Sequence, residues 1–173
     1  MLSIRLATFA DVPLLKRLIH ELAEYEGEPN AIRLTEEDLI RDGFGPAPKF
    51  RAILAEDNGQ PMGYALFFPF YSTWSGSAIF LEDLFVRDAF RGRGIGKALL
   101  GEVARIARQE GCHTIRLDVL DSNAPAIQFY KSLGAEYLTQ WRNVVLREEA
   151  LGRLASPPLA APDNPLVFQS PGS

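Results

Sequence analysis

Three glycines and three basic residues are concentrated between positions 91 and 97, in the run Arg-Gly-Arg-Gly-Ile-Gly-Lys. Glycine accepts left-handed backbone conformations, so closely spaced glycines can turn several N–H groups toward one point. An apolar run precedes these residues and a helical pattern follows them, and the N-terminus of a helix adds partial positive charge. The combination predicts an anion-binding loop between a strand and a helix, with phosphate as the expected ligand.

Spacing excludes two common phosphate-binding loops. A Walker loop requires a glycine five positions before the Gly-Lys pair and Ser or Thr after it, but this chain has Arg91 and Ala98 there. A dinucleotide fingerprint requires Gly or Ala three residues after the second glycine of G-x-G, and the two possible counts reach Lys97 and Leu99. What remains is an R-x-x-G-x-G pattern that begins at Arg91.

Glu82 lies within the apolar run before this loop. In an alternating strand we expect its side chain to be half-buried, and burial raises the pKa of a carboxyl group. Such a group can act as a general base at neutral pH. It can equally be a strand carboxylate paired with a nearby arginine, and the residues alone leave both interpretations open.

Length and charge narrow the class of protein. The 173 residues suit one domain, and a net charge of −4 argues against general nucleic-acid binding, which requires a basic face. No apolar run approaches the roughly 20 residues of a membrane span, and the N-terminus alternates like a strand rather than a signal peptide. One cysteine, Cys112, fits a reducing compartment, so we expect a cytoplasmic protein. The two histidines, His20 and His113, have no metal-ligand spacing, so no metal is expected.

Hydrophobic periodicity predicts the elements that position these residues. Strands are expected at 2–7, 50–56, 62–70, from Ile79 to the loop, at 114–120 and at 137–146. Helices are expected at 9–25, between Thr35 and Gly43, from the loop to Gly111, and at 124–133, with a loop at 71–77. This order predicts a mixed α/β (α+β) domain, with a mostly antiparallel sheet flanked by helices and one strand-loop-helix site. The domain is expected to span 1–148, and the proline-rich segment 149–173 is expected to be an irregular tail that is mobile or wraps a surface.

The order of elements together with the loop resembles the GCN5-related N-acetyltransferase superfamily, over residues 2–146. Within it, four segments are similar to the diamine and thialysine acetyltransferase group. They are residues 22–26, residues 42–45, residues 71–76 with 81–83, and residues 123–131. The resemblance implies transfer of an acetyl group from acetyl-CoA directly to a primary amine of a small molecule, such as a thialysine-like amino acid, a diamine or a polyamine.

Two catalytic roles follow from the resemblance. An alkyl amine with a pKa near 10.4 is almost fully protonated at pH 7, so the enzyme must remove a proton. The resemblance assigns Glu82 as the general base, acting directly or through water, and Tyr130 as the general acid that protonates the departing CoA thiolate. Without the resemblance, Tyr130 could simply pack its helix against the sheet.

The resemblance also implies a cofactor site. The backbone of Leu84, Phe85 and Val86 is expected to bind the pantetheine arm and the thioester carbonyl. The residues expected to hold the pyrophosphate are Arg91, Gly92, Arg93, Gly94, Ile95, Gly96 and Lys97. Asn123 and Ala126, at the start of the next helix, are expected to contribute, although Asn123 also suits the plain role of an N-cap.

The residues expected around the amine are Tyr25, Glu26, Ser72, Trp74, Glu82 and Arg142. Polyamine-acetylating members carry an acidic residue where this chain has Ser72, and the Tyr-Ser-Thr-Trp run is more similar to members that prefer thialysine or related amino acids. Arg142 places a further cation near the expected site. An added cation disfavours a polyamine and favours a substrate that carries a carboxylate.

Two other functions remain open from the sequence: a catalytically silent acyl-CoA sensor, and a protein-lysine or N-terminal acetyltransferase. The presence of both Glu82 and Tyr130 favours an enzyme, and the aromatic segment 71–74 is confining for a protein substrate. The resembled group is commonly homodimeric. A homodimer is therefore expected, with the strand at 137–146 as its interface.

Overall fold

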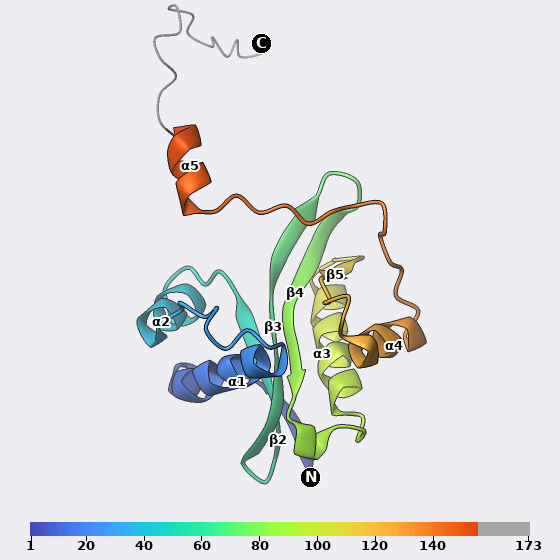
Figure 1. Ribbon diagram of the computed structural model, residues 1–173. Coiled ribbons are helices and arrows are strands. Elements are labelled where there is room, and N and C mark those ends of the chain that lie inside the picture. The colour runs from blue at the N-terminus through green and yellow to red at the C-terminus, as the bar shows by residue number, and fades with distance from the viewer. Residues whose placement is uncertain (156–173) are drawn as a thin grey trace, which may run out of the picture. The chain divides into compact units, whose positions relative to one another are not determined.

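The computed structural model describes residues 1–155, which divide into two compact units, Met1–Asn123 and a second that begins at Ala124. The elements of the first unit are β1 (Leu2–Leu6), η1 (Phe9–Asp11), α1 (Val12–Tyr25), α2 (Glu36–Phe44), β2 (Arg51–Asp57), β3 (Gln60–Ser72), β4 (Gly76–Val86), η2 (Asp88–Phe90), α3 (Ile95–Gln109) and β5 (Ile115–Leu117) (Figure 1). The second unit contains α4 (Ala124–Ser132) and α5 (Glu148–Ala155). Within residues 1–155, no helix is both long and apolar enough to cross a bilayer.

The five strands form one sheet in the order β1-β2-β3-β4-β5. Strands β1 to β4 pair antiparallel, and β5 pairs parallel to β4. At the β2–β3 hairpin, Asn58 and Gly59 have φ angles of 50° and 78°, the left-handed pair that a two-residue hairpin requires. The predicted mixed, mostly antiparallel sheet is therefore confirmed.

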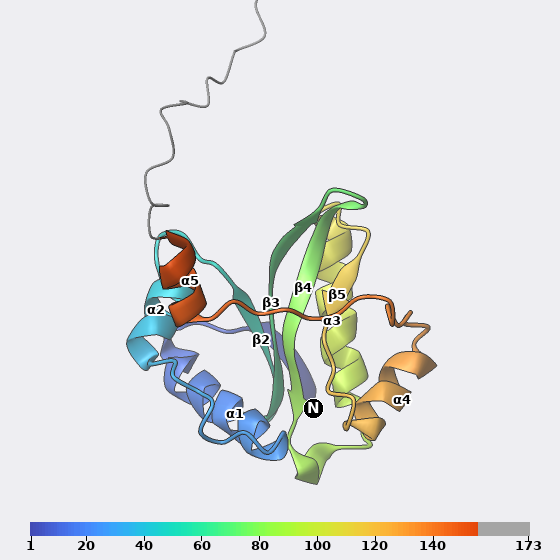
Figure 2. The ribbon, with the colours of Figure 1, turned by 45° about the horizontal axis from the view of Figure 1, so that its top comes forward.

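Helices cover both faces of this sheet (Figure 2). On one face, Leu99 and Val103 of α3 pack in a cluster with Phe67, and on the other, Leu15 and Leu18 of α1 pack in a cluster with α2 and β3. The amphipathic patterns that predicted these helices are explained by this packing, because each helix buries one apolar stripe against the sheet.

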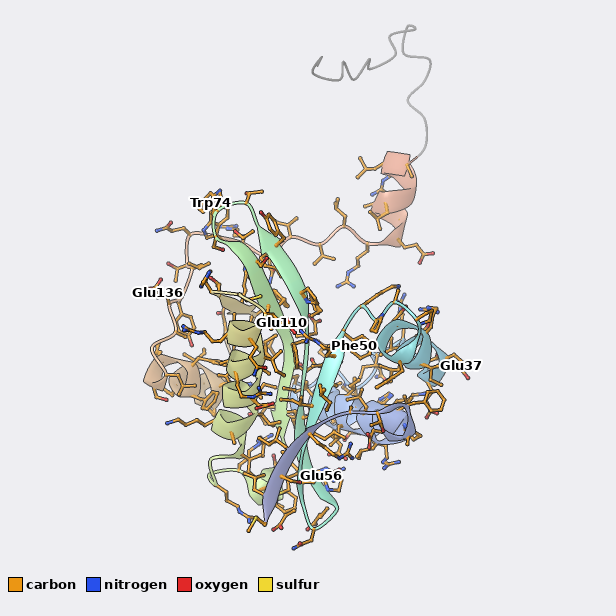
Figure 3. All side chains as sticks on the ribbon, turned by 180° about the vertical axis from the view of Figure 1, so that it is seen from behind. Glu37, Phe50, Glu56, Trp74, Glu110 and Glu136 are labelled. Atoms are coloured by element: carbon orange, nitrogen blue, oxygen red, sulfur yellow. The ribbon has the colours of Figure 1, made fainter. Side chains whose placement is uncertain are left out.

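Two turns differ from the prediction. Gly43 does not end α2, which continues to Phe44; a Cβ on Gly43 would lie 2.4 Å from the Phe50 ring, so glycine is needed there for packing. The predicted loop at 71–77 is too long, because β3 and β4 continue pairing up to Ser72 and Gly76. Only three residues form the turn, with Trp74 at its tip (Figure 3).

The C-terminal predictions need larger corrections. Strand β5 spans three residues rather than 114–120, because it pairs only with Ile79–Leu81 of β4. Residues 137–146 form no strand: the second unit, as far as it is described, contains no other strand to supply a ladder. The tail is not irregular throughout, since α5 precedes the first proline of this segment and an ion pair between Glu149 and Arg153 supports it. The proline-rich part, 156–173, lies outside the described residues.

Candidate active site

Strand β4 contains a β-bulge at Glu82. Asp83 pairs with Leu66 of β3 and Leu81 pairs with Phe67, so Glu82 has no partner across this ladder. The parallel ladder to β5 also ends beside it, at the pair Leu81–Leu117. Glu82 is exposed as a residue, because a bulge residue leaves the regular in-and-out alternation of a strand, although its carboxyl group is partly shielded from water by neighbouring protein atoms.

The bulge also changes which residues of β4 face each helix layer. Before it, Ile79 and Leu81 pack with α3, whereas after it Leu84 and Val86 do so. Phe85 therefore points to the α1 side, where its ring meets that of Tyr64 edge-on. A one-residue insertion has moved the odd-numbered side chains to the opposite face.

Beyond the bulge, one backbone edge of β4 has no strand beside it in the described chain. The N–H of Arg87 donates to Met62 O at 2.9 Å, which fixes the alternation of the ladder to β3. Residues 85 and 87 thus bond to β3, and the backbone groups of Leu84 and Val86 face the other edge. Because β5 ends at Leu117, that edge is available to a ligand that pairs like a strand.

A second carboxylate, that of Asp118, lies near Glu82 where β4 and β5 stop pairing. Asp118 directly follows β5, just as Glu82 directly follows Leu81, and those two leucines are the last pair of the parallel ladder. Partial burial, with the Asp118 carboxylate nearby, raises the pKa of Glu82. Neighbouring carboxylates favour a bound cation, and a raised pKa makes Glu82 a stronger base.

Asp83 is the most buried of the three acidic residues Glu82, Asp83 and Asp118. It accepts a hydrogen bond from the Tyr64 hydroxyl, 2.8 Å away. Burial raises its pKa to about 6, opposed by the Tyr64 bond and assisted by Glu82 and Glu26. Burial also raises the pKa of Tyr64 well above 10, so this phenol remains the donor.

Glu26 completes a carboxylate cluster, which we define as Glu26, Glu82, Asp83 and Asp118. It directly follows α1, and partial burial raises its pKa. The cluster therefore draws on the end of α1, the bulge of β4 and the end of β5. Raised pKa values on carboxyl groups gathered from separate segments are typical of a functional site.

The predicted anion-binding loop, residues 91–97, follows β4 and begins α3. Gly92 and Gly94 have φ angles of 74° and 78°, and a Cβ on either would meet nothing within 4 Å. Gly94 is the N-cap of α3 and provides no side-chain cap, and no acidic residue lies in the first turn. The exposed Arg93 and Lys97 add positive charge. Open backbone N–H groups, the helix dipole and two cations together fit a pyrophosphate.

Arg91 is held differently from the other cations of this loop. Its Nε donates to Val86 O at 2.8 Å, and its guanidinium pairs with Asp88 at 2.7 Å. The guanidinium carbon also lies 4.0 Å from the centre of the Tyr25 ring. The Tyr25 hydroxyl in turn donates to Oδ1 of Asn123, 3.4 Å away.

The remaining predicted site residues fall into two groups. Ser72 closes the β3–β4 turn, where its hydroxyl accepts from the N–H of Trp74 and of Ser75 at 3.2 and 3.3 Å. Ser72 pairs with Gly76, so about six residues of strand, roughly 20 Å, separate this turn from Glu82. Within one chain the structure does not bring Ser72 or Trp74 to the carboxylate cluster.

Tyr130, Ala126 and Arg142 belong to the second unit. Tyr130 is buried near the end of α4, and its ring contacts that of Phe129 with centroids 5.1 Å apart. Burial, and then the nearby Tyr137, raise the pKa of Tyr130 to about 12, which keeps its proton in place at neutral pH. Ala126 lies in the first turn of α4, and Arg142 is exposed.

The sequence analysis did not identify Tyr64 or Asp118 as site residues. It also did not place Asp83 in the carboxylate cluster. The bulge leaves no pattern of its own in the sequence, so the orientation of Asp83 could not be read from alternation. Asp118 did carry a signal, since an acidic residue near the end of a strand parallel to the Glu82 strand will lie at the same edge of the sheet.

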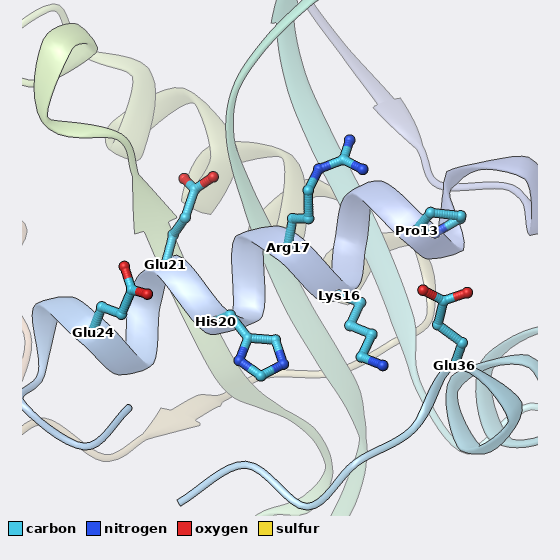
Figure 4. A pocket seen from close by; sticks show the side chains of 7 residues that line it. All are labelled: Pro13, Lys16, Arg17, His20, Glu21, Glu24 and Glu36. Carbon is cyan, nitrogen blue, oxygen red and sulfur yellow. The ribbon is translucent and has the colours of Figure 1, made fainter. Parts of the chain in front are cut away.

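A separate open pocket of about 470 Å³ lies on α1 (Figure 4). Its lining is mostly charged and consists of Pro13, Lys16, Arg17, His20, Glu21, Glu24 and Glu36. None of these residues belongs to the predicted site. We assign the chemistry to the carboxylate cluster and the loop instead, because those groups combine raised pKa values with an open backbone edge. In residues 1–155 no group of three or more His, Cys, Asp or Glu could hold a metal ion.

Known proteins are similar to this chain in sequence. A thialysine N-epsilon-acetyltransferase of Sus scrofa is 41% identical over 163 residues, which cover 88% of this chain and 96% of that protein. Spermidine/spermine N(1)-acetyltransferase-like protein 1 of Homo sapiens is 38% identical over 140 residues, which cover 77% of this chain and 20% of that protein.

Solved structures agree on the fold. An aminoglycoside N-acetyltransferase in complex with CoA has a TM-score of 0.69 at 22% identity, covering 86% of this chain and 95% of that one. An integron cassette protein from the mobile metagenome of V. cholerae reaches 0.75 at 25% identity, covering 90% and 98%. The sequence model of the acetyltransferase (GNAT) family matches residues 15–135. The chain therefore belongs to the acetyltransferase (GNAT) family.

Proposed function

We propose that the protein transfers an acetyl group from acetyl-CoA directly to a primary amine of a small molecule. The main support for this proposal is the carboxylate cluster. It lies where the pairing of β4 with β5 ends, and the loop at 91–97 follows later in the chain, after β4 itself has ended. Anionic groups suit a cationic amine, and the cationic loop suits the phosphates of the cofactor. The names of the similar proteins, which act on thialysine and ornithine, support the same class of substrate.

Acetyl-CoA supplies an activated thioester, and the residues of the chain bind, orient and move protons. Glu82, with its raised pKa, accepts the proton of the bound ammonium, directly or through water. The backbone of Leu84 to Val86 binds the pantetheine arm along the open edge of β4, and residues 91–97 bind the pyrophosphate. Asn123 and Ala126 complete the proposed set of cofactor-binding residues. Tyr130 keeps its proton at neutral pH and donates it to the leaving thiolate.

The substrate class can be narrowed further. We propose an amine that also carries a carboxylate, such as thialysine or ornithine, because Ser72 and Arg142 depart from the acidic pattern of polyamine-acetylating members. Since Ser72 and Trp74 lie far from Glu82 in one chain, their proposed role depends on a homodimer in which one subunit supplies them to the other.

Several exposed apolar side chains support the homodimer. Trp141, Val144 and Leu146 are 58%, 82% and 55% exposed. A second copy that covers them would remove this apolar surface from water. We also propose that the catalytic domain spans 1–148 and that the protein works in the cytoplasm, where a reducing environment suits the free thiol of Cys112.

The test is the release of free thiol from acetyl-CoA in the presence of thialysine, ornithine, lysine, spermidine or a lysine-containing peptide. Thiol release above the hydrolysis rate with a small amine, and larger kcat/KM for thialysine or ornithine than for spermidine, is the expected result. Tight CoA binding with no amine-dependent release would favour the acyl-CoA sensor. Release with the peptide alone would favour a protein acetyltransferase.

A further inference from the structure

Arg91 begins the R-x-x-G-x-G pattern, and its side chain makes three contacts outside the loop. It contacts the Val86 carbonyl, the Asp88 carboxylate and the face of the Tyr25 ring. The Phe85 ring lies further away, at 5.9 Å. Arg93 is also exposed, and its guanidinium carbon lies 5.6 Å from the ring of Phe90, the last residue of η2. The two arginines of the pattern therefore have different surroundings.

Tyr25 connects segments that are far apart in the sequence. It is the last residue of α1, directly before Glu26 of the carboxylate cluster. Its ring covers Arg91, and its hydroxyl reaches Asn123, just before α4 begins. One side chain thus links the end of α1, the start of the loop and the residue that precedes α4.

We propose that Tyr25 and Arg91 act as positioning residues for the acetyl-CoA loop, with Tyr25 fixing the loop from α1 through its stack on Arg91. In this arrangement the Arg91 side chain anchors the first residue of the loop to β4 instead of binding phosphate, which narrows the side-chain ligands proposed above for the pyrophosphate to the other cations of the loop. The N–H groups that follow, at Gly92 and Gly94, are then oriented before the cofactor arrives, which reduces the ordering cost of binding. Tyr25 consequently acts on the cofactor rather than on the amine.

The inference rests on the proposed use of acetyl-CoA, and its test is a binding measurement that requires no turnover. CoA is titrated calorimetrically into the wild type, Tyr25→Leu, Arg91→Met and the double variant, with thermal unfolding to verify that each is folded. Loss of a cation–π stack between two exposed side chains predicts CoA binding weaker by about two- to fivefold for Tyr25→Leu. Arg91→Met should weaken binding by at least as much, and the double variant should be within about twofold of Arg91→Met, because the stack can be lost only once.

Matched variants separate the effect of the ring stack on CoA affinity from the effect of charge. Tyr25→Phe keeps the ring and should bind CoA within about twofold of the wild type. Arg93→Met removes a charge of the same loop. Its effect on CoA affinity should multiply with that of Tyr25→Leu, and it should lessen the salt dependence of that affinity. Arg91→Met should leave the salt dependence unchanged.

Three results would overturn the inference: an unchanged CoA affinity in Tyr25→Leu, multiplying effects of Tyr25→Leu and Arg91→Met, or a raised KM for the amine as the sole effect of Tyr25→Leu. Failure of the proposed function can be distinguished from failure of this inference. In that case the wild type acetylates no amine, while the binding pattern for CoA can still be present or absent.

Discussion

The two sides of the proposed site, at the end of β4, are built in opposite ways. The loop at 91–97 is one continuous segment whose glycines have left-handed φ angles and whose cations are exposed. The carboxylate cluster draws on the end of α1, the bulge of β4 and the residue after β5, and three of its four members have raised pKa values. The cofactor side therefore depends on local backbone conformation, and the amine side depends on tertiary assembly.

The difference in construction predicts a difference in sensitivity. Substitutions in the carboxylate cluster should change proton transfer and leave CoA binding intact, whereas substitutions in the loop should change CoA binding first. The largest expected effect is that of Glu82→Gln, which should lower turnover about a hundredfold or more because the base is lost. Steady-state kinetics give turnover, and calorimetric titration should give a CoA affinity within about twofold of the wild type.

Glu37→Gln is the matched control for Glu82→Gln, because Glu37 is an exposed glutamate in the first turn of α2. It should leave turnover unchanged. If Glu82→Gln instead abolished CoA binding, Glu82 would be a structural carboxylate and the assignment of the base would be wrong.

Tyr130→Phe is expected to lower turnover by up to about a hundredfold, since the phenol is the proposed proton donor. Tyr137→Phe serves as its control; the Tyr137 hydroxyl donates to Ile127 O at 2.9 Å, which is a structural bond. The control should affect thermal stability more than turnover. A Tyr130→Phe variant with wild-type turnover and a lowered melting temperature would make Tyr130 a packing residue.

Asp83 should make stability depend on pH. Its pKa is raised to about 6, so the folded protein keeps this proton to a higher pH than the unfolded chain, where the pKa is about 3.9. The free energy of unfolding should therefore fall as pH rises from about 4 to about 6 and then level off, by about 3 kcal/mol in total. Asp83→Asn should lack this fall, which urea unfolding at a series of pH values would measure. Identical pH dependence in both proteins would contradict the raised pKa.

On the loop side, Gly94→Ala should lower the free energy of unfolding by about 1 kcal/mol, because a side chain is strained at a φ of 78°. It should weaken CoA binding as well. Gly101→Ala is the matched control in the interior of α3: a Cβ there meets nothing within 4 Å, and the substitution should raise stability by about 0.5–1 kcal/mol. If both variants behaved alike, the left-handed conformation would not be what the loop requires.

The same contrast explains what the sequence could predict. The position of the loop after β4 and at the start of α3 was predicted because its glycines and cations are contiguous, and its role in binding the cofactor stays a prediction. The helices α1 and α3 were predicted because each has a regular apolar stripe. The roles of Asp83 and Tyr64 were not predicted, because the bulge at Glu82 shifts the alternation of β4 and leaves no periodic signal. The strand expected at 137–146 was wrong because alternation predicts a strand only where a partner ladder exists.

The most direct test of the proposed division between the two sides is the pH dependence of kcat with one acetylated amine, in the wild type and in Glu82→Gln. The raised pKa of Glu82 predicts an acid limb in the wild-type profile with a midpoint above the ordinary glutamate value of about 4.3. That limb should be absent from the low residual activity of Glu82→Gln. A limb with the same midpoint in both proteins would contradict the assignment of Glu82 as the group that accepts the amine proton.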